Sequence, residues 1–136
     1  MRVLLDSNIL IASIVLNGKT TNKVLQHIIS TDEFELVLSD TIIDETRKVV
    51  EARWKNSLEY FEDFIKDIKF HYLRLCAGDK VVNIRDPKDK HVIASALEAE
   101  IDLLITGDKD FFEYEYDFEV ITPSGYIAKY IDFSAN

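Results

Sequence analysis

Residues 86–111 read DPKDKHVIASALEAEIDLLITGDKDF, a stretch that joins a predicted helix to a buried strand and an acid-rich turn. Val92, Ile93 and Ala96 recur with helical spacing and predict a helix from Pro87 to Ala99. The apolar run LLIT at 103–106 has the length and composition of a buried strand. A helix followed by a strand too apolar to face water is typical of an α/β protein with a parallel sheet.

The same alternation continues on both sides of this stretch. Further strands are predicted at residues 2–5, 34–38 and 118–122. Further helices are predicted at residues 21–30, from Ser39 onwards, at 58–68 and at 123–130. Residues 71–84 are ambiguous, and could form two short strands around a Gly78-Asp79 turn. The pattern predicts one parallel sheet covered by helices on both sides.

Length and composition set further limits. A chain of 136 residues can bury a core, and we expect a single domain over residues 1–136. The one cysteine, Cys76, cannot form an internal disulfide, and no basic-then-apolar signal segment opens the chain, so we expect a cytoplasmic protein. The longest nearly apolar run, residues 9–16, is far shorter than the roughly 20 residues of a membrane span, and no membrane association is expected. The net charge of −9 disfavours nucleic-acid binding, unless the acids surround metal ions that invert the local field.

Acids follow two of the predicted strands directly. Asp6 ends the strand RVLL, and Asp108 follows LLIT, with Asp110 two residues later. In open parallel sheets the functional crevice lies beyond the carboxyl ends of the strands, where the strand order reverses. We therefore expect these carboxylates to lie close together.

Two helices are predicted to add one acid each. Helical geometry places Glu45 at the edge of an apolar face, whereas its neighbour Asp44 points to solvent. Asp89 falls within the apolar stripe of its helix, while Asp86, before Pro87, has the pattern of an N-cap. Two alternatives remain open: Glu45 could be an exposed helix acid, and Asp89 could serve only in a capping box.

Carboxylates gathered at one spot raise one another's pKa unless cations compensate them. Asp6, Glu45, Asp89 and Asp108, with Asp110 in reserve, would form an all-oxygen ligand set, which favours Mg²⁺ or Mn²⁺. Such a site activates water and stabilises the charge of a phosphodiester undergoing in-line displacement. The chemistry that these residues indicate is hydrolysis of a nucleic acid.

The motifs resemble those of the PIN domain, the nuclease fold of VapC-like toxins of prokaryotic toxin–antitoxin systems. The resemblance covers nearly the whole chain and rests on LLDSNILIAS, LSDTIIDE, the opening stretch at 86–111 and ITP at 121–123. It implies a three-layer α/β/α sandwich with a central parallel sheet, and Mg²⁺- or Mn²⁺-dependent cleavage of single-stranded RNA. It also implies a cognate antitoxin as partner, and makes a homodimer plausible.

Position by position, Asp6, Glu45, Asp89 and Asp108 match the four acids of the family, and Asp110 matches an additional acid found in part of it. Asn8 and Thr106 match small polar positions that orient carboxylates. Four cations near the acids, Arg85, Lys88, Lys90 and Lys109, could bind RNA phosphates or could simply screen the acids. The three histidines, His27, His71 and His91, are interpreted as surface or packing residues, with His91 pointing away from Asp89.

Two other classes of function remain open. A non-catalytic PIN module could bind RNA or a protein through the same crevice. A metal-dependent phosphatase could use a similar sheet, although a haloacid-dehalogenase-like enzyme would need a second aspartate where Asn8 stands.

Overall fold

The computed structural model describes residues 1–75 and 89–133, and all statements below concern these residues. Their strands form one parallel sheet in the order β3-β2-β1-β4-β5. The strands are β1 (Arg2–Leu5), β2 (Glu35–Ser39), β3 (His71–Leu73), β4 (Leu103–Ile105) and β5 (Glu119–Ile121). The parallel sheet predicted from the apolar runs is therefore confirmed.

The central strands are buried on both faces. Val3, Leu4 and Leu5 of β1 and all three residues of β4 have no exposed surface. Side chains of a strand alternate between the two faces of the sheet, so an apolar layer must cover each face. This is why these strands are continuous apolar runs rather than alternating patterns.

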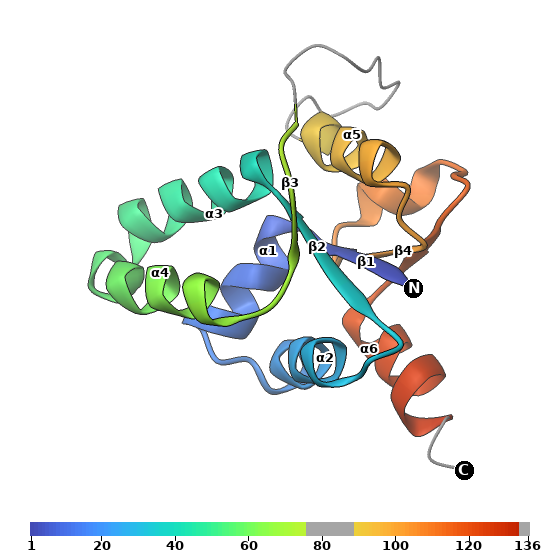
Figure 1. Cartoon of the computed structure of the whole chain (residues 1–136), viewed down its shortest axis with the longest axis horizontal. Coiled ribbons are helices and arrows are strands. Elements are labelled where there is room, and N and C mark those ends of the chain that lie inside the picture. Colours follow the sequence, from blue (N-terminus) through green and yellow to red (C-terminus); the bar gives the residue numbers. More distant parts are fainter. Residues whose placement is uncertain (76–88, 134–136) are drawn as a thin grey trace.

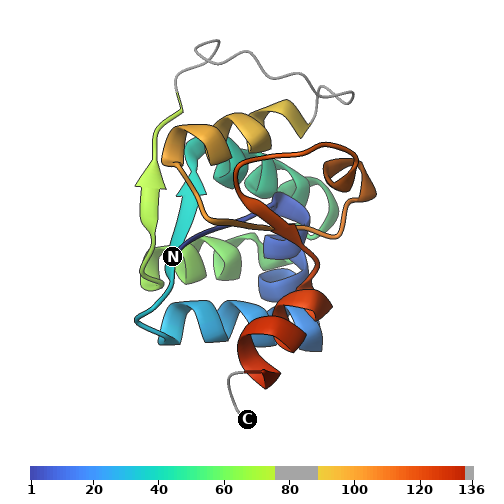
Figure 2. The same cartoon turned by 90° about the vertical axis from the view of Figure 1, so that its right-hand side faces the viewer.

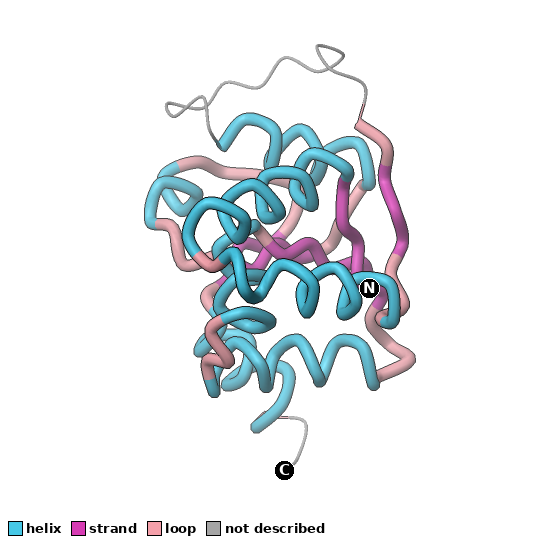
Figure 3. The backbone as a smooth tube through the Cα atoms, turned by 90° about the vertical axis from the view of Figure 1, so that its left-hand side faces the viewer, coloured by secondary structure: helices cyan, strands magenta, loops and turns pink. Residues whose placement is uncertain are grey.

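Helices supply the two covering layers. Figure 1 shows α3 and α4 on one side of the sheet and α5 on the other, and Figures 2 and 3 view the two sides in turn. The helices are α1 (Ser7–Leu10), α2 (Lys19–Ser30), α3 (Asp40–Arg53), α4 (Leu58–Asp67), α5 (Lys90–Ala99) and α6 (Pro123–Tyr126). The chain runs from β1 outward to β3 and then returns to β4, beside β1. Strand order thus reverses between β1 and β4, and their carboxyl ends form the crevice.

Local sequence signals account for several helix boundaries. The hydroxyl of Ser39 accepts a hydrogen bond from the backbone N–H of Ile42, so Ser39 caps α3 as predicted. Thr122 caps α6 in the same way, with Pro123 in the first turn. Beyond Tyr126 the helix widens into a π-helical segment, Ile127–Asp132, which extends the predicted closing helix. The predicted starts of α5 at Pro87 and of a strand near 80 lie outside the described residues.

The structure contains one helix near its amino end that the sequence patterns did not predict. The apolar run after Asp6 forms α1 and a π-helical segment, Ile11–Val15, that continues it. Ile9, Leu10, Ile11 and Ile14 are all buried, so this segment gave a nearly continuous apolar run instead of a helical period. Glu100 is exposed and ends α5 in the left-handed conformation, with φ of 51°.

In the described part of the chain, no helix is long and apolar enough to cross a membrane.

An aromatic cluster closes the end of the molecule where α2 and α6 meet. The buried ring of Tyr126 lies beside His27, Phe34 and Tyr130. The Tyr126 hydroxyl and His27 Nδ1 are 2.7 Å apart and hydrogen-bonded. Burial, and then the neighbouring Tyr130, raise the pKa of Tyr126. The packing role predicted for His27 is confirmed.

This hydrogen bond can be tested with Tyr126→Phe. The substitution keeps the ring but leaves the partly buried His27 without this partner, so we expect a loss of about 1 kcal/mol in the free energy of unfolding. Tyr126→Ala should cost about 3–5 kcal/mol, because it also leaves a cavity. Urea denaturation followed by circular dichroism measures both. Equal stability of Tyr126→Phe and wild type would show that the bond contributes nothing.

Candidate metal centre

Asp6 stands at the carboxyl end of β1 and is only 4% exposed. Its Oδ1 accepts a hydrogen bond of 3.0 Å from the backbone N–H of Ile9, which makes Asp6 the N-cap of α1. Its Oδ2 accepts a short hydrogen bond from the hydroxyl of Thr106. Burial raises the pKa of Asp6; these two hydrogen bonds oppose the rise, and the charges of Asp108 and Glu45 add to it.

Thr106 and Asp108 stand at the carboxyl end of the neighbouring strand β4. The Thr106 hydroxyl also accepts a hydrogen bond of 3.1 Å from the backbone N–H of Asp108. Asp108 Oδ1 in turn accepts one of 2.9 Å from the N–H of Asp110, which starts a 3-10 helix at Lys109–Glu113. One buried threonine thus connects the two strand ends through hydrogen bonds, which fits the orienting position expected for it.

Asp89, Asp108 and Asp110 form the tightest acidic cluster of the described chain. Each offers a carboxylate oxygen, and these oxygens lie within 4.8 Å of one another. Asp89 lies at the start of α5, and its charge, after burial and Tyr114, raises the pKa of Tyr116. The Tyr116 ring stacks on Phe118 with 4.8 Å between ring centroids. Tyr116 is therefore an aromatic residue close to Asp89, and no sequence motif indicated it.

Glu45 approaches from α3 and is held at both carboxylate oxygens. Oε1 accepts a hydrogen bond of 2.8 Å from the hydroxyl of Ser7, and Oε2 forms a short ion pair with His91 Nε2. An open groove of about 460 Å³ starts at Glu45 and His91 and runs along α3 past Thr41, Asp44, Lys48 and Val49. Solvent therefore reaches Glu45 from the side of α3.

Two predicted positions differ from the structure. Asn8 is exposed, and its side chain makes no hydrogen bond within the described ranges; its neighbour Ser7 contacts Glu45 instead. His91, interpreted as a surface or packing residue, contacts Glu45. Asp44 is exposed as predicted and pairs with Arg47 at 2.7 Å.

The predicted cations are only partly described. Lys90 and Lys109 are exposed and form no ion pair with any described residue. Arg85 and Lys88 lie outside the described residues, as do Asp86 and Cys76.

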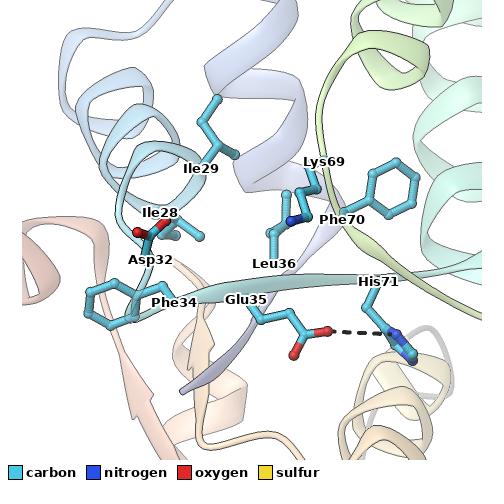
Figure 4. A pocket seen from close by; sticks show the side chains of 9 residues that line it. All are labelled: Ile28, Ile29, Asp32, Phe34, Glu35, Leu36, Lys69, Phe70 and His71. Carbon is cyan, nitrogen blue, oxygen red and sulfur yellow. Dashed lines mark ion pairs between the residues drawn. The ribbon is translucent and has the colours of Figure 1, made fainter.

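A second hollow lies at the opposite end of the sheet, at the amino ends of β2 and β3. Figure 4 shows its lining, which includes Phe34, Leu36 and Phe70, and the ion pair of 3.7 Å between Glu35 and His71 at its rim. Its volume is about 360 Å³. Because the carboxyl ends of the strands carry the acids, this hollow is separate from the candidate metal centre.

The donor set fits a hard divalent cation. All of the clustered ligand atoms are carboxylate oxygens, the type that Mg²⁺ and Mn²⁺ prefer. Burial raises the pKa of Asp6, and the charges of Asp108 and Glu45 add to this rise. Compensation by an ion would favour the ionised form of the carboxylates.

Asp6→Asn tests this electrostatic strain in metal-free protein. A carboxyl whose pKa is higher in the folded than in the unfolded state costs stability as pH rises from its ordinary value, about 3.9, through the folded value. Asparagine keeps the cap and cannot ionise, so we expect the variant to be more stable than wild type at pH 7 with chelator present. The difference should shrink toward pH 4, as measured by urea denaturation. If the variant is less stable than wild type at pH 7, the ionised carboxylate of Asp6 does not destabilise the metal-free protein.

Comparisons with known proteins give two kinds of result. The sequence model of the PIN domain family matches residues 2–110 of this chain. Among curated proteins, no similar sequence is found. Among solved structures, a chain of VapBC2 from Rickettsia felis, bound to a DNA fragment from its promoter, has 14% identity and a TM-score of 0.66; the match covers 90% of this chain and 98% of that chain.

VapC20 of Mycobacterium tuberculosis, a toxin that cleaves the sarcin-ricin loop, has 11% identity and a TM-score of 0.60. The match covers 82% of this chain and 93% of that chain. At these identities the two structures establish the fold, and the sequence model, which spans most of the chain, establishes the family. The chain is a member of the PIN domain family.

Proposed function

We propose that this chain is a divalent-metal-dependent endoribonuclease that cleaves single-stranded RNA, and that residues 1–136 work as one nuclease domain. The observation that carries this proposal is the convergence of Asp6, Asp89, Asp108 and Asp110 at the carboxyl ends of β1 and β4. These are acids that the sequence motifs of the PIN family single out. VapC20, which shares the fold, cleaves an RNA loop, and this supports RNA as the substrate.

The acids divide into two groups by their surroundings. Asp89, Asp108 and Asp110 have oxygens close enough to share one ion, and we assign them as its ligands, with Asp6 beside them. Glu45 is close enough to Asp6 for its charge to act on that carboxyl and is open to the groove along α3, so it can orient a water molecule or a second ligand. When bound, Mg²⁺ or Mn²⁺ supplies the positive charge that stabilises the phosphodiester and activates water.

The protein's own residues position the substrate and the acids. Thr106 and the N–H of Ile9 hold the carboxylate of Asp6 in one orientation. Lys90 and Lys109 flank the acidic cluster in the sequence and have no ion pair within the described ranges, so they can bind RNA phosphates. We assign Arg85 and Lys88 the same role from their place in the sequence.

We also infer a toxin role with a cognate antitoxin as partner, in the cytoplasm, with a homodimer as the assembly to test first. The support is the fold shared with VapC20 and with a chain of the VapBC2 complex. The rival from another class is a non-catalytic PIN module that binds RNA or protein, and metal-dependent turnover separates the two. A phosphatase would release phosphate from small phosphoesters, which the same assay can include.

The first test is cleavage of short single-stranded RNAs with Mg²⁺, Mn²⁺ or chelator. Asp6→Asn and Asp89→Asn should each lower the rate by at least about 100-fold, because each carboxylate helps to hold charge that the others cannot hold alone. Asp44→Asn is the matched control: Asp44 is exposed, is adjacent to Glu45 and pairs with Arg47, and this variant should retain wild-type activity. Equal cleavage rates for wild type and Asp6→Asn in preparations free of contaminating nuclease would refute the proposed ribonuclease activity.

The second test measures metal binding without RNA. A ligand that binds only the folded state stabilises it by about 2.7 kcal/mol at 100 times its dissociation constant. Mn²⁺ should therefore raise the melting temperature of wild type and of Asp44→Asn, and raise it much less for Asp108→Asn. Asparagine keeps the acceptor for the N–H of Asp110, so the local turn is preserved. The same Mn²⁺ response in all three proteins would place the ion elsewhere.

A further inference from the structure

His91 connects α5 to α3 directly at the candidate metal centre. Its Nε2 meets Glu45 Oε2, and its Nδ1 lies 3.1 Å from the hydroxyl of Thr41. An ionised carboxylate can only accept hydrogen bonds, so Nε2 carries the proton of that contact. The Thr41 hydroxyl can either donate or accept, so it can hold the other ring nitrogen in either protonation state.

The ring is supported by a chain of buried or partly buried hydroxyls. Thr41 Oγ1 lies 3.1 Å from Ser39 Oγ, and Ser39 Oγ lies 2.8 Å from Ser95 Oγ. Ser95 Oγ is also 2.7 Å from the backbone carbonyl of His91. Ser39 and Ser95 have no exposed surface. The orientation of the imidazole is therefore fixed by polar groups from β2, α3 and α5.

The chain of hydrogen bonds ends at the Glu45 carboxylate, whose second oxygen is held by Ser7. Ser7 directly follows Asp6, so the residue next to one acid holds the carboxylate of the other. A contact that served only to pack α5 on α3 could be apolar. Here the polar contacts instead restrict both oxygens of Glu45, a carboxylate whose charge acts on the buried Asp6.

We propose that His91 is a positioning residue for Glu45, and that together with Ser7 it holds this carboxylate in the orientation that the divalent-ion site uses. This role rests on the proposed metal-dependent nuclease. A carboxylate fixed in advance loses less conformational freedom when an ion binds, so His91 raises the affinity for the ion. In this role His91 acts through its contact with Glu45.

The test measures Mn²⁺ affinity by isothermal titration calorimetry on folded, metal-free protein. His91→Ala should weaken binding by about 10- to 100-fold, the usual effect of losing a partner of a metal ligand. His91→Gln keeps an N–H donor that can reach Glu45 and should recover much of the loss. Thr41→Val removes the support of the ring and should weaken binding less than His91→Ala does.

A matched control and a kinetic readout separate positioning from folding. His71→Ala removes the other histidine that pairs with a glutamate, at the far end of the sheet, and should leave Mn²⁺ affinity unchanged. For His91→Ala the cleavage rate should fall at limiting Mn²⁺ and recover in excess Mn²⁺, while KM for RNA stays constant. Circular dichroism confirms that each variant is folded.

Three outcomes would overturn the role. Wild-type Mn²⁺ affinity in folded His91→Ala would show that the contact does not serve the ion. Tighter binding in His91→Ala would show that His91 competes with the ion for Glu45. No Mn²⁺ binding to wild type would refute both the proposed nuclease and this role, whereas the first two outcomes refute the role of His91 alone.

Discussion

The buried carboxylate of Asp6 is the constraint on which the site depends. It follows Val3, Leu4 and Leu5, which have no exposed surface, and at this place loss of water disfavours its charge and nearby acids disfavour it further. Two hydrogen bonds oppose this cost, from Thr106 and from the N–H of Ile9. Ile9 belongs to α1, which starts at the end of β1, and Thr106 follows β4. The two hydrogen bonds therefore require both the start of α1 and the register between β1 and β4 that the structure has.

The topology explains why acids from distant parts of the sequence meet. The chain leaves β1 toward β2 and β3 and returns to β4 beside β1, so the strand order reverses between β1 and β4. Asp6 and Asp108 occupy the two strand ends at this point. The starts of α3 and α5 flank it and bring Glu45 and Asp89 near. A site of this kind requires parallel strands, because only then do all carboxyl ends face one way.

Much of this could be predicted from sequence, for identifiable reasons. Strand ends are marked by acids after apolar runs, and helix periodicity predicted that Glu45 and Asp89 face the site. In the structure Asp89 lies with Asp108 and Asp110, and Glu45 contacts Ser7 and His91. One error arises at α1, because its N-cap, Asp6, was interpreted only as the end of a strand and a metal ligand. Because α1 starts directly after Asp6, successive residues are rotated by about 100° around the helix axis. Ser7 therefore faces Glu45, and Asn8 faces solvent. The direction of His91 was predicted only relative to Asp89 on the same helix. Its partner, Glu45, lies on the neighbouring helix α3, and a helical wheel of α5 cannot show a contact with another helix.

The net charge of −9 is compatible with an RNA substrate, because cations neutralise the acids to different extents in different parts of the molecule. Away from the site, some cations pair with acids: Arg47 with Asp44 and Glu62, and Lys129 with Glu119. Near the site, Lys90 and Lys109 form no ion pair with any described residue. Exposed charges are screened over roughly 8 Å at physiological ionic strength, so a phosphate at the cluster is influenced mainly by these neighbours and by a bound ion. The overall charge therefore describes the distant surface, and the local field at the carboxyl ends of β1 and β4 decides what binds there.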